Sequence, residues 1–303
     1  MEKEPLVGIA IAVHNGIERT RECLLALDQT HYQRLFICVV DDGSVDDTWS
    51  VLSNEFPHVK AVRGDGNLWW TGGTNLAIRE CLKVNCELVV LLNPDCIVEP
   101  GTITALVTHA LQYPDTVVAS VVVDQTSSQK VWWAGTIWGP LKGIPFVWTL
   151  RYRYKREHGY KVSDLPSESF PTAETGGRGV LIPKGIFEAV GLFDEAVFPH
   201  YAADNDFGLR VHEAGYNIVV TPHARVGLYV DNTGLNWHLT LRQLPNEYFK
   251  RMFSRKHGEF LHCSWHLLRR HVPWYAFLPS LGFWHALSLW RFFTSSLRTA
   301  FNQ

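Results

Sequence analysis

Short apolar runs that end in polar turns limit the fold of this chain more than any other feature of its sequence. Residues 35–40 (LFICVV) run directly into 41–44 (DDGS), and residues 88–92 (LVVLL) run into 93–95 (NPD). Continuous apolar runs with β-branched residues are typical of strands buried on both faces of a parallel sheet. Ligands of such sheets bind outside the carboxyl ends of the strands. The two turns therefore predict a site for a nucleotide and a divalent cation at one sheet edge.

Helix-like segments alternate with these strands, which predicts the α/β class with a mostly parallel, doubly wound sheet flanked by helices. The predicted strands are 7–13, 35–40, 59–63, 88–92, 117–123, 179–182 and 217–221. The predicted helices are 18–27, 47–56, 75–84, 101–111, 184–190 and 204–214. Residues 124–175 break the pattern and are predicted to be a strand-poor insertion. Their four Trp residues either contribute to an acceptor pocket or pack a surface excursion.

Charge and cysteine usage add two expectations. Nine Lys or Arg residues accompany two Glu residues in 241–303, a net formal charge of +7 within a chain whose total is −2. This basic, aromatic-rich tail favours an anionic surface as its partner. The six Cys residues have no Cys-x-x-Cys spacing, so we expect reduced, mostly buried thiols in a cytoplasmic protein. We also expect no signal peptide and no nucleic-acid partner.

The first two strands end in polar residues that suit a nucleoside pocket. An Asp at a strand end accepts the imide N–H of a pyrimidine base or binds ribose hydroxyls. The candidates are Val13, Asn15, Asp41, Asp42 and Ser44. The alternative is that residues 41–44 form only a turn and a helix cap.

A glycine-rich stretch, residues 64–75 (GDGNLWWTGGTN), precedes the helix predicted at 75–84. Glycine lets backbone N–H groups approach phosphates, and a helix N-terminus favours anions. The stretch is not a Walker loop, because no Gly-Lys-Ser/Thr follows, and it does not follow the first strand as the dinucleotide fingerprint does.

The second acidic turn predicts a metal ligand. Mg²⁺ or Mn²⁺ held by one or two protein ligands can bridge a diphosphate and neutralise its charge as it leaves. Asp95 supplies such a ligand, and a simple Asx-type turn is the alternative. His223, just after the last predicted strand, is a second candidate ligand, since imidazole suits Mn²⁺ better than Mg²⁺. A structural histidine is the alternative.

Two carboxylates open the predicted helix 204–214. Asp204 and Asp206 are candidates for a general base beside an acceptor hydroxyl. Acids in the first turn of a helix also complement its dipole, which is the structural alternative. His262 and His266 share a helix face but lack the Glu of a His-Glu-x-x-His motif, so we expect a structural role near an interface rather than zinc binding.

Taken together in this order, the motifs resemble family 2 glycosyltransferases of the GT-A fold, over about residues 6–230. The resemblance rests on segments 13–15, 41–44, 67–75, 93–95, 175–179, 191–195 and 204–207. Segment 67–70 (NLWW) together with 93–95 is most similar to the rhamnosyltransferase-like branch, which builds bacterial surface polysaccharides.

The resemblance implies inverting, metal-dependent transfer of a sugar from a nucleoside diphosphate sugar. It maps Asp41 and Asp42 to base and ribose contacts, Asp95 and His223 to the metal, and Asp204 to the catalytic base. The further donor-binding positions that it implies are Asn67, Trp70, Gly72, Gly73, Asn75, Asn93, Gly176, Gly177 and Arg178. Two departures matter. Asn93 replaces the first Asp of the metal motif, and Ala203 replaces the Glu that usually precedes the base, so Asp206 remains an alternative base.

We expect a catalytic domain over 1–235, with a donor half to about 123 and an acceptor half beyond it, followed by a helical extension over 236–303. Residues 272–290 lack Asp, Glu, Lys and Arg but include two Pro and several Trp and Tyr. We favour helices lying in the membrane interface at the inner face of the cell membrane. A packed subdomain or dimer surface and a true membrane span are the alternatives. The expected acceptor is a saccharide or a lipid-diphosphate-linked saccharide.

Two other functions compete with this interpretation. A sugar-phosphate nucleotidyltransferase would need a glycine-rich triphosphate loop with Arg and Lys after the first strand, and residues 13–19 (VHNGIER) do not form one. A non-catalytic sugar-nucleotide-binding protein is motivated by the single carboxylate of the metal motif. The presence of both Asp95 and Asp204 argues against it.

Overall fold

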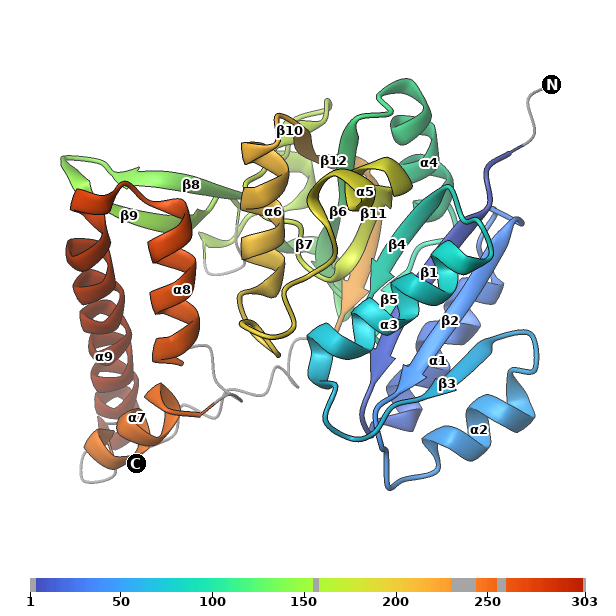
Figure 1. Ribbon diagram of the computed structural model, residues 1–303, viewed down its shortest axis with the longest axis horizontal. Helices are drawn as coiled ribbons and strands as arrows, with labels where there is room; N and C mark the ends of the chain where they lie inside the picture. The colour runs from blue at the N-terminus through green and yellow to red at the C-terminus, as the bar shows by residue number, and fades with distance from the viewer. Residues whose placement is uncertain (1–3, 155–157, 230–243, 255–259, 302–303) are drawn as a thin grey trace.

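The computed structural model describes residues 4–154, 158–229, 244–254 and 260–301. Within these residues the chain forms a large mixed sheet flanked by helices, with a second group of helices at its C-terminal end (Figure 1). The α/β class and the helical C-terminal extension predicted from the sequence are confirmed. The domain boundary predicted at residue 235 lies outside the described residues.

The large sheet runs in the order β10-β12-β6-β11-β4-β1-β2-β3. Neighbours pair in parallel in β1–β2, β1–β4, β2–β3 and β6–β12, whereas β11 is antiparallel to both β4 and β6. The strand bounds are β1 Val7–Val13, β2 Leu35–Asp41, β3 Lys60–Arg63, β4 Leu88–Leu92, β6 Thr116–Asp124, β10 Phe170–Pro171, β11 Arg178–Pro183 and β12 Asn217–Leu228. From β1 the chain adds β2 and then β3 on one side of β1, and it then crosses back to place β4 on the other side. The junction between β1 and β4 is therefore a topological switch point.

The central strands are buried along their whole length, which explains their continuous apolar sequence. Every residue of β4 and of β6 is buried. Helix α3 (Trp69–Lys83) packs against β1 and β2, and α4 (Thr102–Gln112) packs against β6, β11 and β12. The other helices of this part are α1 Ile17–Asp28, α2 Thr48–Glu55, α5 Lys184–Val190 and α6 Ala203–Glu213. This core holds the strand ends, and hence the site, in fixed register.

The insertion at 124–175 is rich in strands, so the prediction of a strand-poor segment is wrong. It contains β7 (Ser127–Trp133), β8 (Thr136–Leu141) and β9 (Ile144–Tyr152). The β8–β9 pair forms its own two-stranded sheet. Glycine and proline inside the segment masked the strand pattern, because these residues usually mark turns. A short strand after the second acidic turn, β5 (Cys96–Val98), was also not predicted.

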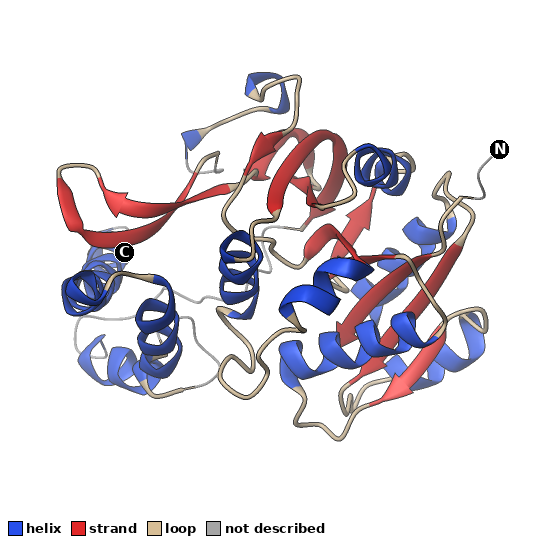
Figure 2. Cartoon of the chain, turned by 45° about the horizontal axis from the view of Figure 1, so that its top comes forward, coloured by secondary structure: helices blue, strands red, loops and turns tan. Residues whose placement is uncertain are grey.

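The hairpin β8–β9 packs on the C-terminal helices, so two stretches far apart in sequence form one unit (Figure 2). Trp284 of α9 (Phe277–Phe301) donates its indole N–H to the Trp148 carbonyl at 2.8 Å, and the Ser280 hydroxyl accepts from the Trp148 amide at 2.8 Å. The rings of Trp138, Trp148 and Trp284 form a cluster with centroids about 6 Å apart. Trp138 and Trp148 therefore pack the extension rather than only their own segment.

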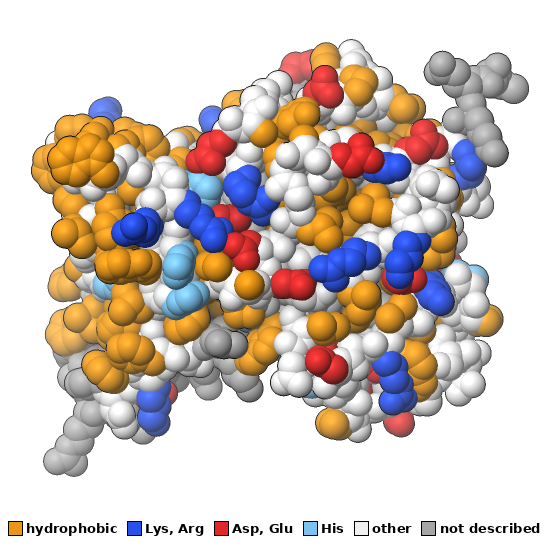
Figure 3. All heavy atoms as spheres, viewed as in Figure 1, with side chains coloured by type: hydrophobic (Ala, Val, Ile, Leu, Met, Phe, Trp, Pro, Cys, Tyr) orange, Lys and Arg blue, Asp and Glu red, His pale blue; other side chains and the backbone are white. Residues whose placement is uncertain are grey.

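Two shorter helices complete the extension, α7 (Leu244–Met252) and α8 (Leu261–His271). Figure 3 shows hydrophobic side chains gathered over this end of the molecule. The most exposed large ones there include Phe249, Trp274, Leu278 and Trp290, with Trp274 89% exposed. None of the helices in the described part of the chain is both long enough and apolar enough to cross a membrane. All six cysteines are free and buried, as predicted.

Candidate functional site at the carboxyl edge of the sheet

The carboxyl ends of β1, β2 and β4 meet at one edge of the sheet, as the sequence predicts. Val13 at the end of β1 pairs with Asp41 at the end of β2, and Leu92 at the end of β4 pairs with Arg178. The turn that holds Asn93 therefore lies at the same edge as the acidic turn after β2. This edge is also the switch point of the sheet, where open α/β folds bind their ligands.

Asp42 organises the loop that follows β3. Its side chain is buried, and its two carboxylate oxygens accept the backbone N–H groups of Gly66 at 2.9 Å and Trp69 at 2.8 Å. A buried carboxylate needs such donors, because an unpaired one would be costly. Asp42 thus connects the end of β2 to the start of α3.

Asp41 and its neighbours form a compact turn around the end of β1. The Asp41 carboxylate accepts the Ser44 amide at 2.9 Å, and the Ser44 hydroxyl accepts the Asn15 amide at 2.8 Å. The Asn15 side-chain oxygen accepts the Val45 amide at 2.9 Å. The structure therefore brings Val13, Asn15, Asp41 and Ser44 together at the ends of β1 and β2.

Trp70, Asn93 and Gly177 meet beside this turn although they come from three separate segments. The Trp70 indole N–H donates to the Asn93 side-chain oxygen at 2.9 Å. A Cβ on Gly177 would lie 2.7 Å from the Trp70 ring and 3.0 Å from that same oxygen, so only glycine fits there. Gly176 precedes it with a left-handed φ of 62°. These predicted donor-site residues are therefore neighbours, and Asn93 is already engaged by Trp70.

The predicted phosphate loop differs from the observed structure, because α3 begins at Trp69 and not at residue 75. Gly72 and Gly73 are therefore helical and buried, and a Cβ on Gly73 would lie 2.9 Å from the Ala12 Cβ. The Asn75 amide donates to the Phe193 carbonyl at 2.8 Å and to Glu195 at 2.7 Å. The structure assigns Gly72, Gly73 and Asn75 to packing, while Asn67 remains exposed in the loop.

The pairing of His223 with Asp95 at one metal ion is contradicted by the strand register. Asp95 immediately precedes Cys96, which pairs with Leu228 at the end of β12. His223 lies at a bulge in the middle of β12 and is exposed. The paired residues 225–227 therefore separate His223 from Leu228, the residue beside the Asp95 turn. The prediction of His223 as a partner ligand is therefore wrong.

Among the described residues of the turn after β4, Asp95 is the one that offers a carboxylate to a metal. It is half-buried, and one of its oxygens accepts a weak bond from the Cys96 thiol at 3.7 Å. The described residues include no cluster of three or more His, Cys, Asp or Glu side chains able to hold a metal ion. This donor set fits an ion that is carried mainly by the phosphates of a substrate, as Mg²⁺ commonly is.

Across the edge from Asp95, a pair of acidic residues lies in the acceptor half. Glu174 is buried, and its carboxylate accepts the Trp133 indole N–H at 3.1 Å and the Asn205 side-chain amide. Burial raises the pKa of Glu174 to about 8, and the charge of neighbouring Asp204 acts in the same direction. Glu174 was not among the residues predicted from the sequence. Its position directly before Thr175 and the two glycines, which were predicted to lie at the site, was the signal in the sequence that could have indicated it.

Asp204 stands in the first turn of α6 beside this carboxylate. Burial raises the pKa of Asp204, and the Asn205 backbone N–H and the charge of Arg178 offset this only in part. Arg178 lies over the Trp132 ring, 4.8 Å from its centroid. The predicted residues Gly176, Gly177, Arg178 and Asp204 thus line one side of the site.

Asp206 is not available as a base. Its side chain is fully buried, and it forms ion pairs with Arg210 at 2.8 Å and with Arg270 and His271 at 3.0 Å each. Burial would raise the pKa of Asp206, but the bonds from His271 and Arg210 and the Arg210 charge lower it to about 2. This carboxylate belongs to the packing of α6, which leaves Asp204 as the candidate base.

Backbone conformation supports this location of the site. Among the described residues, four non-glycine residues have positive φ, and three of them border the site: Asn15 at 58°, Trp69 at 58° and Ala202 at 68°. Such conformations cost of order 1–3 kcal/mol each and cluster at functional sites. Ala202 directly precedes α6 and so sets the direction of Asp204.

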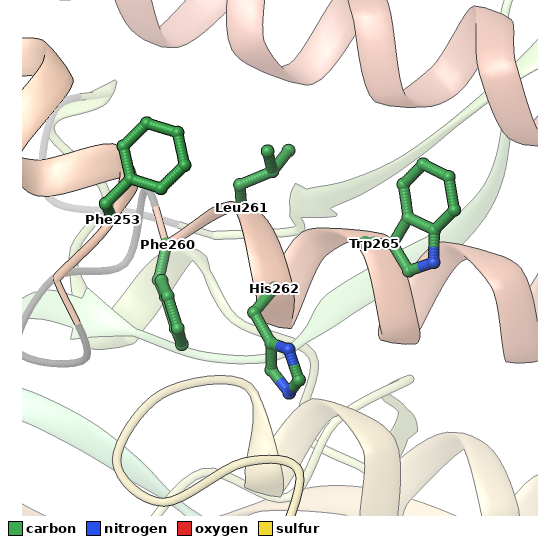
Figure 4. A pocket seen from close by; sticks show the side chains of 5 residues that line it. All are labelled: Phe253, Phe260, Leu261, His262 and Trp265. Atoms are coloured by element: carbon green, nitrogen blue, oxygen red, sulfur yellow. The ribbon is translucent and has the colours of Figure 1, made fainter.

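Two shallow cavities lie away from the strand ends. One, of about 280 Å³, is lined by Phe253, Phe260, Leu261, His262 and Trp265 between the end of α7 and the start of α8 (Figure 4). The other, of about 290 Å³, lies between β8 and α6 and includes Arg153 and His212. Neither contains any of the carboxylates described above.

Solved structures share this fold. The chain matches GalNAc-T7 with UDP, GalNAc and Mn²⁺ with a TM-score of 0.61 at 14% identity, covering 90% of this chain and 52% of that one. It matches a mannosyltransferase of Pyrobaculum calidifontis in complex with GDP-Man and Mn²⁺ with a TM-score of 0.59 at 15% identity, covering 98% and 74%. The chain thus spans about half the length of the GalNAc-T7 chain. The predicted GT-A fold, the class that these glycosyltransferases share, is confirmed.

The sequence then identifies the family. The model of glycosyl transferase family 2 matches residues 8–173, more than half of the chain, and the protein belongs to that family of enzymes. It is 26% identical over 240 residues to an N-acetylglucosaminyl-diphospho-decaprenol L-rhamnosyltransferase of Mycobacterium tuberculosis, covering 73% of this chain and 74% of that one. It is 28% identical over 247 residues to an uncharacterized glycosyltransferase of Rickettsia typhi, covering 77% and 68%. The predicted glycosyltransferase class and the likeness to the rhamnosyltransferase-like branch are confirmed.

Proposed function

We propose that the protein is an inverting, metal-dependent glycosyltransferase that moves a sugar from a nucleoside diphosphate sugar to a hydroxyl of a saccharide or lipid-linked saccharide. One observation carries the proposal. The nucleoside-side turn with Asp41 and Asp42, the metal-side Asp95 and the candidate base Asp204 all border one sheet edge, joined by the Trp70–Asn93–Gly177 contact. This juxtaposition supports a donor site beside a base.

The donor would lie along this edge from the nucleoside to the sugar. Asp41, Asp42 and Ser44, with Val13 and Asn15, form the nucleoside walls in this proposal. The diphosphate lies at Asp95, and the transferred sugar lies against Trp70, Gly176 and Gly177. Arg178 adds a positive charge on the sugar side. The close contact of Gly177 with Trp70 supports this order, because it keeps the floor of the site free of side chains.

Asp95 would hold the Mn²⁺ or Mg²⁺ ion together with the donor diphosphate. When bound, such an ion neutralises the charge that builds on the leaving diphosphate. Because Asn93 accepts a hydrogen bond from Trp70, it contributes positioning of the turn rather than a second carboxylate. One protein carboxylate is within the range used for phosphate-bound Mg²⁺.

Asp204 would remove the proton of the acceptor hydroxyl as that oxygen attacks the anomeric carbon from the face opposite the diphosphate. This attack forms the new glycosidic C–O bond, breaks the bond to the diphosphate oxygen and inverts the anomeric configuration. Burial raises the pKa of Asp204, which brings it nearer the neutral range where a general base is efficient.

The donor we favour is dTDP-rhamnose or a UDP-sugar, and the acceptor is a saccharide or a lipid-diphosphate-linked saccharide of bacterial surface polysaccharide. The likeness to an N-acetylglucosaminyl-diphospho-decaprenol L-rhamnosyltransferase supports this choice. The exposed Trp274 and Trp290, with exposed Arg291 next to Trp290, support docking of the extension on an anionic membrane at its cytoplasmic face. Co-sedimentation with vesicles of anionic against neutral lipid tests the docking. Equal binding to both would contradict it.

A donor panel tests the function. dTDP-rhamnose, UDP-sugars and GDP-sugars are each incubated with Mn²⁺ or Mg²⁺ and a saccharide or lipid-linked acceptor, and nucleoside diphosphate release is measured. We expect metal-dependent release from one donor, with the anomeric configuration of the product inverted by NMR. Binding of a donor without turnover under any of these conditions would instead support a non-catalytic sugar-nucleotide-binding protein, the reading that the single metal carboxylate favours.

A further inference from the structure

Side chains of the C-terminal extension form ion pairs with α6, the helix that carries the candidate base Asp204. Asp206, two residues after Asp204 on α6, is fully buried. Its carboxylate accepts Arg270 at 3.0 Å and His271 at 3.0 Å, both from α8, in addition to Arg210 of its own helix. A buried carboxylate with three cationic partners is a strong and directional anchor, because charge-assisted bonds are roughly twice as strong as neutral ones.

The same two residues of α8 reach further along the base-bearing segment. Arg270 uses its second terminal nitrogen to donate to Asp194 at 2.8 Å, in the loop between α5 and α6. His271 uses its second ring nitrogen to contact Glu213 at 2.7 Å, at the end of α6. The helix α8 thus holds the approach to α6, its first turn and its last turn at once.

Besides these two residues of α8, the side-chain bond from Asn205 to the buried Glu174 also restrains the first turn of α6. The residue before the helix, Ala202, has a left-handed φ of 68° and provides no side-chain cap. The Asp204 carbonyl accepts only a long bond from Thr175 at 3.4 Å among the side-chain contacts found in the described part of the chain. The contacts of Arg270 and His271 with Asp206 therefore restrain this turn from the side of the extension, opposite the Asn205–Glu174 bond.

We propose that Arg270 and His271 are positioning residues for catalysis, which hold the Asp204 carboxylate in its reactive orientation through Asp206. The proposal rests on the proposed function of Asp204 as the base. It makes the extension a part of the catalytic apparatus rather than only a docking element. Small displacements of a catalytic group are costly, since a shift of about 1 Å can reduce the rate by about 10²-fold.

The test compares Arg270→Ala with Arg269→Ala in the full chain. Arg269 is the preceding residue on α8, is exposed, and makes no ion pair with the described residues. For Arg270→Ala we expect kcat to fall by about 10²-fold with the donor KM unchanged. Arg269→Ala should keep both constants. Arg270→Lys should recover part of kcat, because one ammonium can pair with Asp206 or Asp194 but cannot copy the two-nitrogen bridge.

A second readout separates positioning from folding and does not depend on turnover. Hydrogen–deuterium exchange of the amides of residues 203–207 should speed up in Arg270→Ala while those of β1 and β4 stay protected. Unchanged exchange at 203–207, or a kcat equal to that of the wild type, would overturn the proposal. Loss of protection throughout the sheet would also overturn it, because that pattern indicates a general role in stability. Absence of turnover in the wild type would refute the proposed function. The exchange data would still show whether Arg270 restrains the first turn of α6.

Discussion

The two halves of the site hold their carboxylates by different means. In the donor half, Asp41 and Asp42 accept backbone N–H groups of nearby turns, from Ser44 three residues away and from Gly66 and Trp69 in the next loop. In the acceptor half, Glu174 and Asp206 are held by side chains from distant segments, 41 residues away at Trp133 and 64 residues away at Arg270. Hydrogen bonds from backbone N–H groups do not depend on which side chains the turns carry, so they hold the donor half rigidly. Hydrogen bonds from side chains do depend on residue type, so substitutions can change the environment of the base.

The largest effect is expected from breaking the acceptor half at its centre. In Asp204→Asn the amide cannot take a proton, so we expect kcat to fall by about 10²–10⁴-fold. Donor affinity should stay the same, because the donor-half turns do not involve this residue. Steady-state kinetics and calorimetric titration of the nucleoside diphosphate check both statements. Asp115→Asn, in the exposed turn just before the start of β6 and not at the carboxyl ends of the strands, is the control. Full activity in Asp204→Asn would remove this residue as the base.

Breaking the donor half at Asp95 should have the next largest effect. Asp95→Ala removes the carboxylate proposed to hold the ion, so we expect transfer to fall by about 10²-fold and to need more Mn²⁺ for half-maximal rate. A Mn²⁺ titration of the initial rate measures the shift. If the metal dependence of Asp95→Ala matched that of the wild type, the ion would bind elsewhere on the protein.

A methyl group added between α6 and Glu174 tests how tightly the acceptor half is packed. A Cβ on Gly208 would lie 2.7 Å from the Ala173 carbonyl oxygen, whereas a Cβ on Gly185 of α5 would meet no atom within 4 Å. We expect Gly208→Ala to lose about 1–3 kcal/mol of unfolding free energy through overpacking. Gly185→Ala should be neutral or stabilising, because the helix propensity of Ala is higher than that of Gly. Urea denaturation of the pair gives the difference, and equal midpoints would mean that α6 has room to move.

The same contrast explains what could be predicted from the sequence. The strands β1, β2 and β4 and their polar turns were predicted because apolar runs and adjacent polar residues are local signals. The early start of α3 was missed because Gly72 and Gly73 usually indicate a loop, whereas here they let the helix approach Ala12 closely. His223 was misplaced because strand register is not visible locally. The roles of Glu174 and Arg270 could not be predicted for the same reason, because their partners are distant in the sequence and come close only in the folded chain.

The smallest expected effect concerns the pH dependence of stability in the acceptor half. Burial raises the pKa of Glu174 to about 8, so its protonated form is favoured in the folded state. An acid with a raised pKa contributes stability that is complete below its unfolded pKa and is lost as the pH rises through the folded value. The wild type should therefore lose about 1 kcal/mol of unfolding free energy from this group between pH 7 and pH 9.

Glu174→Gln isolates that contribution, because the amide keeps the size of the side chain and cannot ionise. We expect the variant to match the wild type more closely at pH 7 than at pH 9, where it should be the more stable of the two. Thermal unfolding of both proteins at the two pH values measures the difference, with Glu188→Gln on the exposed face of α5 as the control. A constant difference between Glu174→Gln and the wild type from pH 7 to pH 9 would mean that Glu174 is ionised throughout. The acceptor half would then hold two adjacent charges, with Arg178 as the cation that balances them.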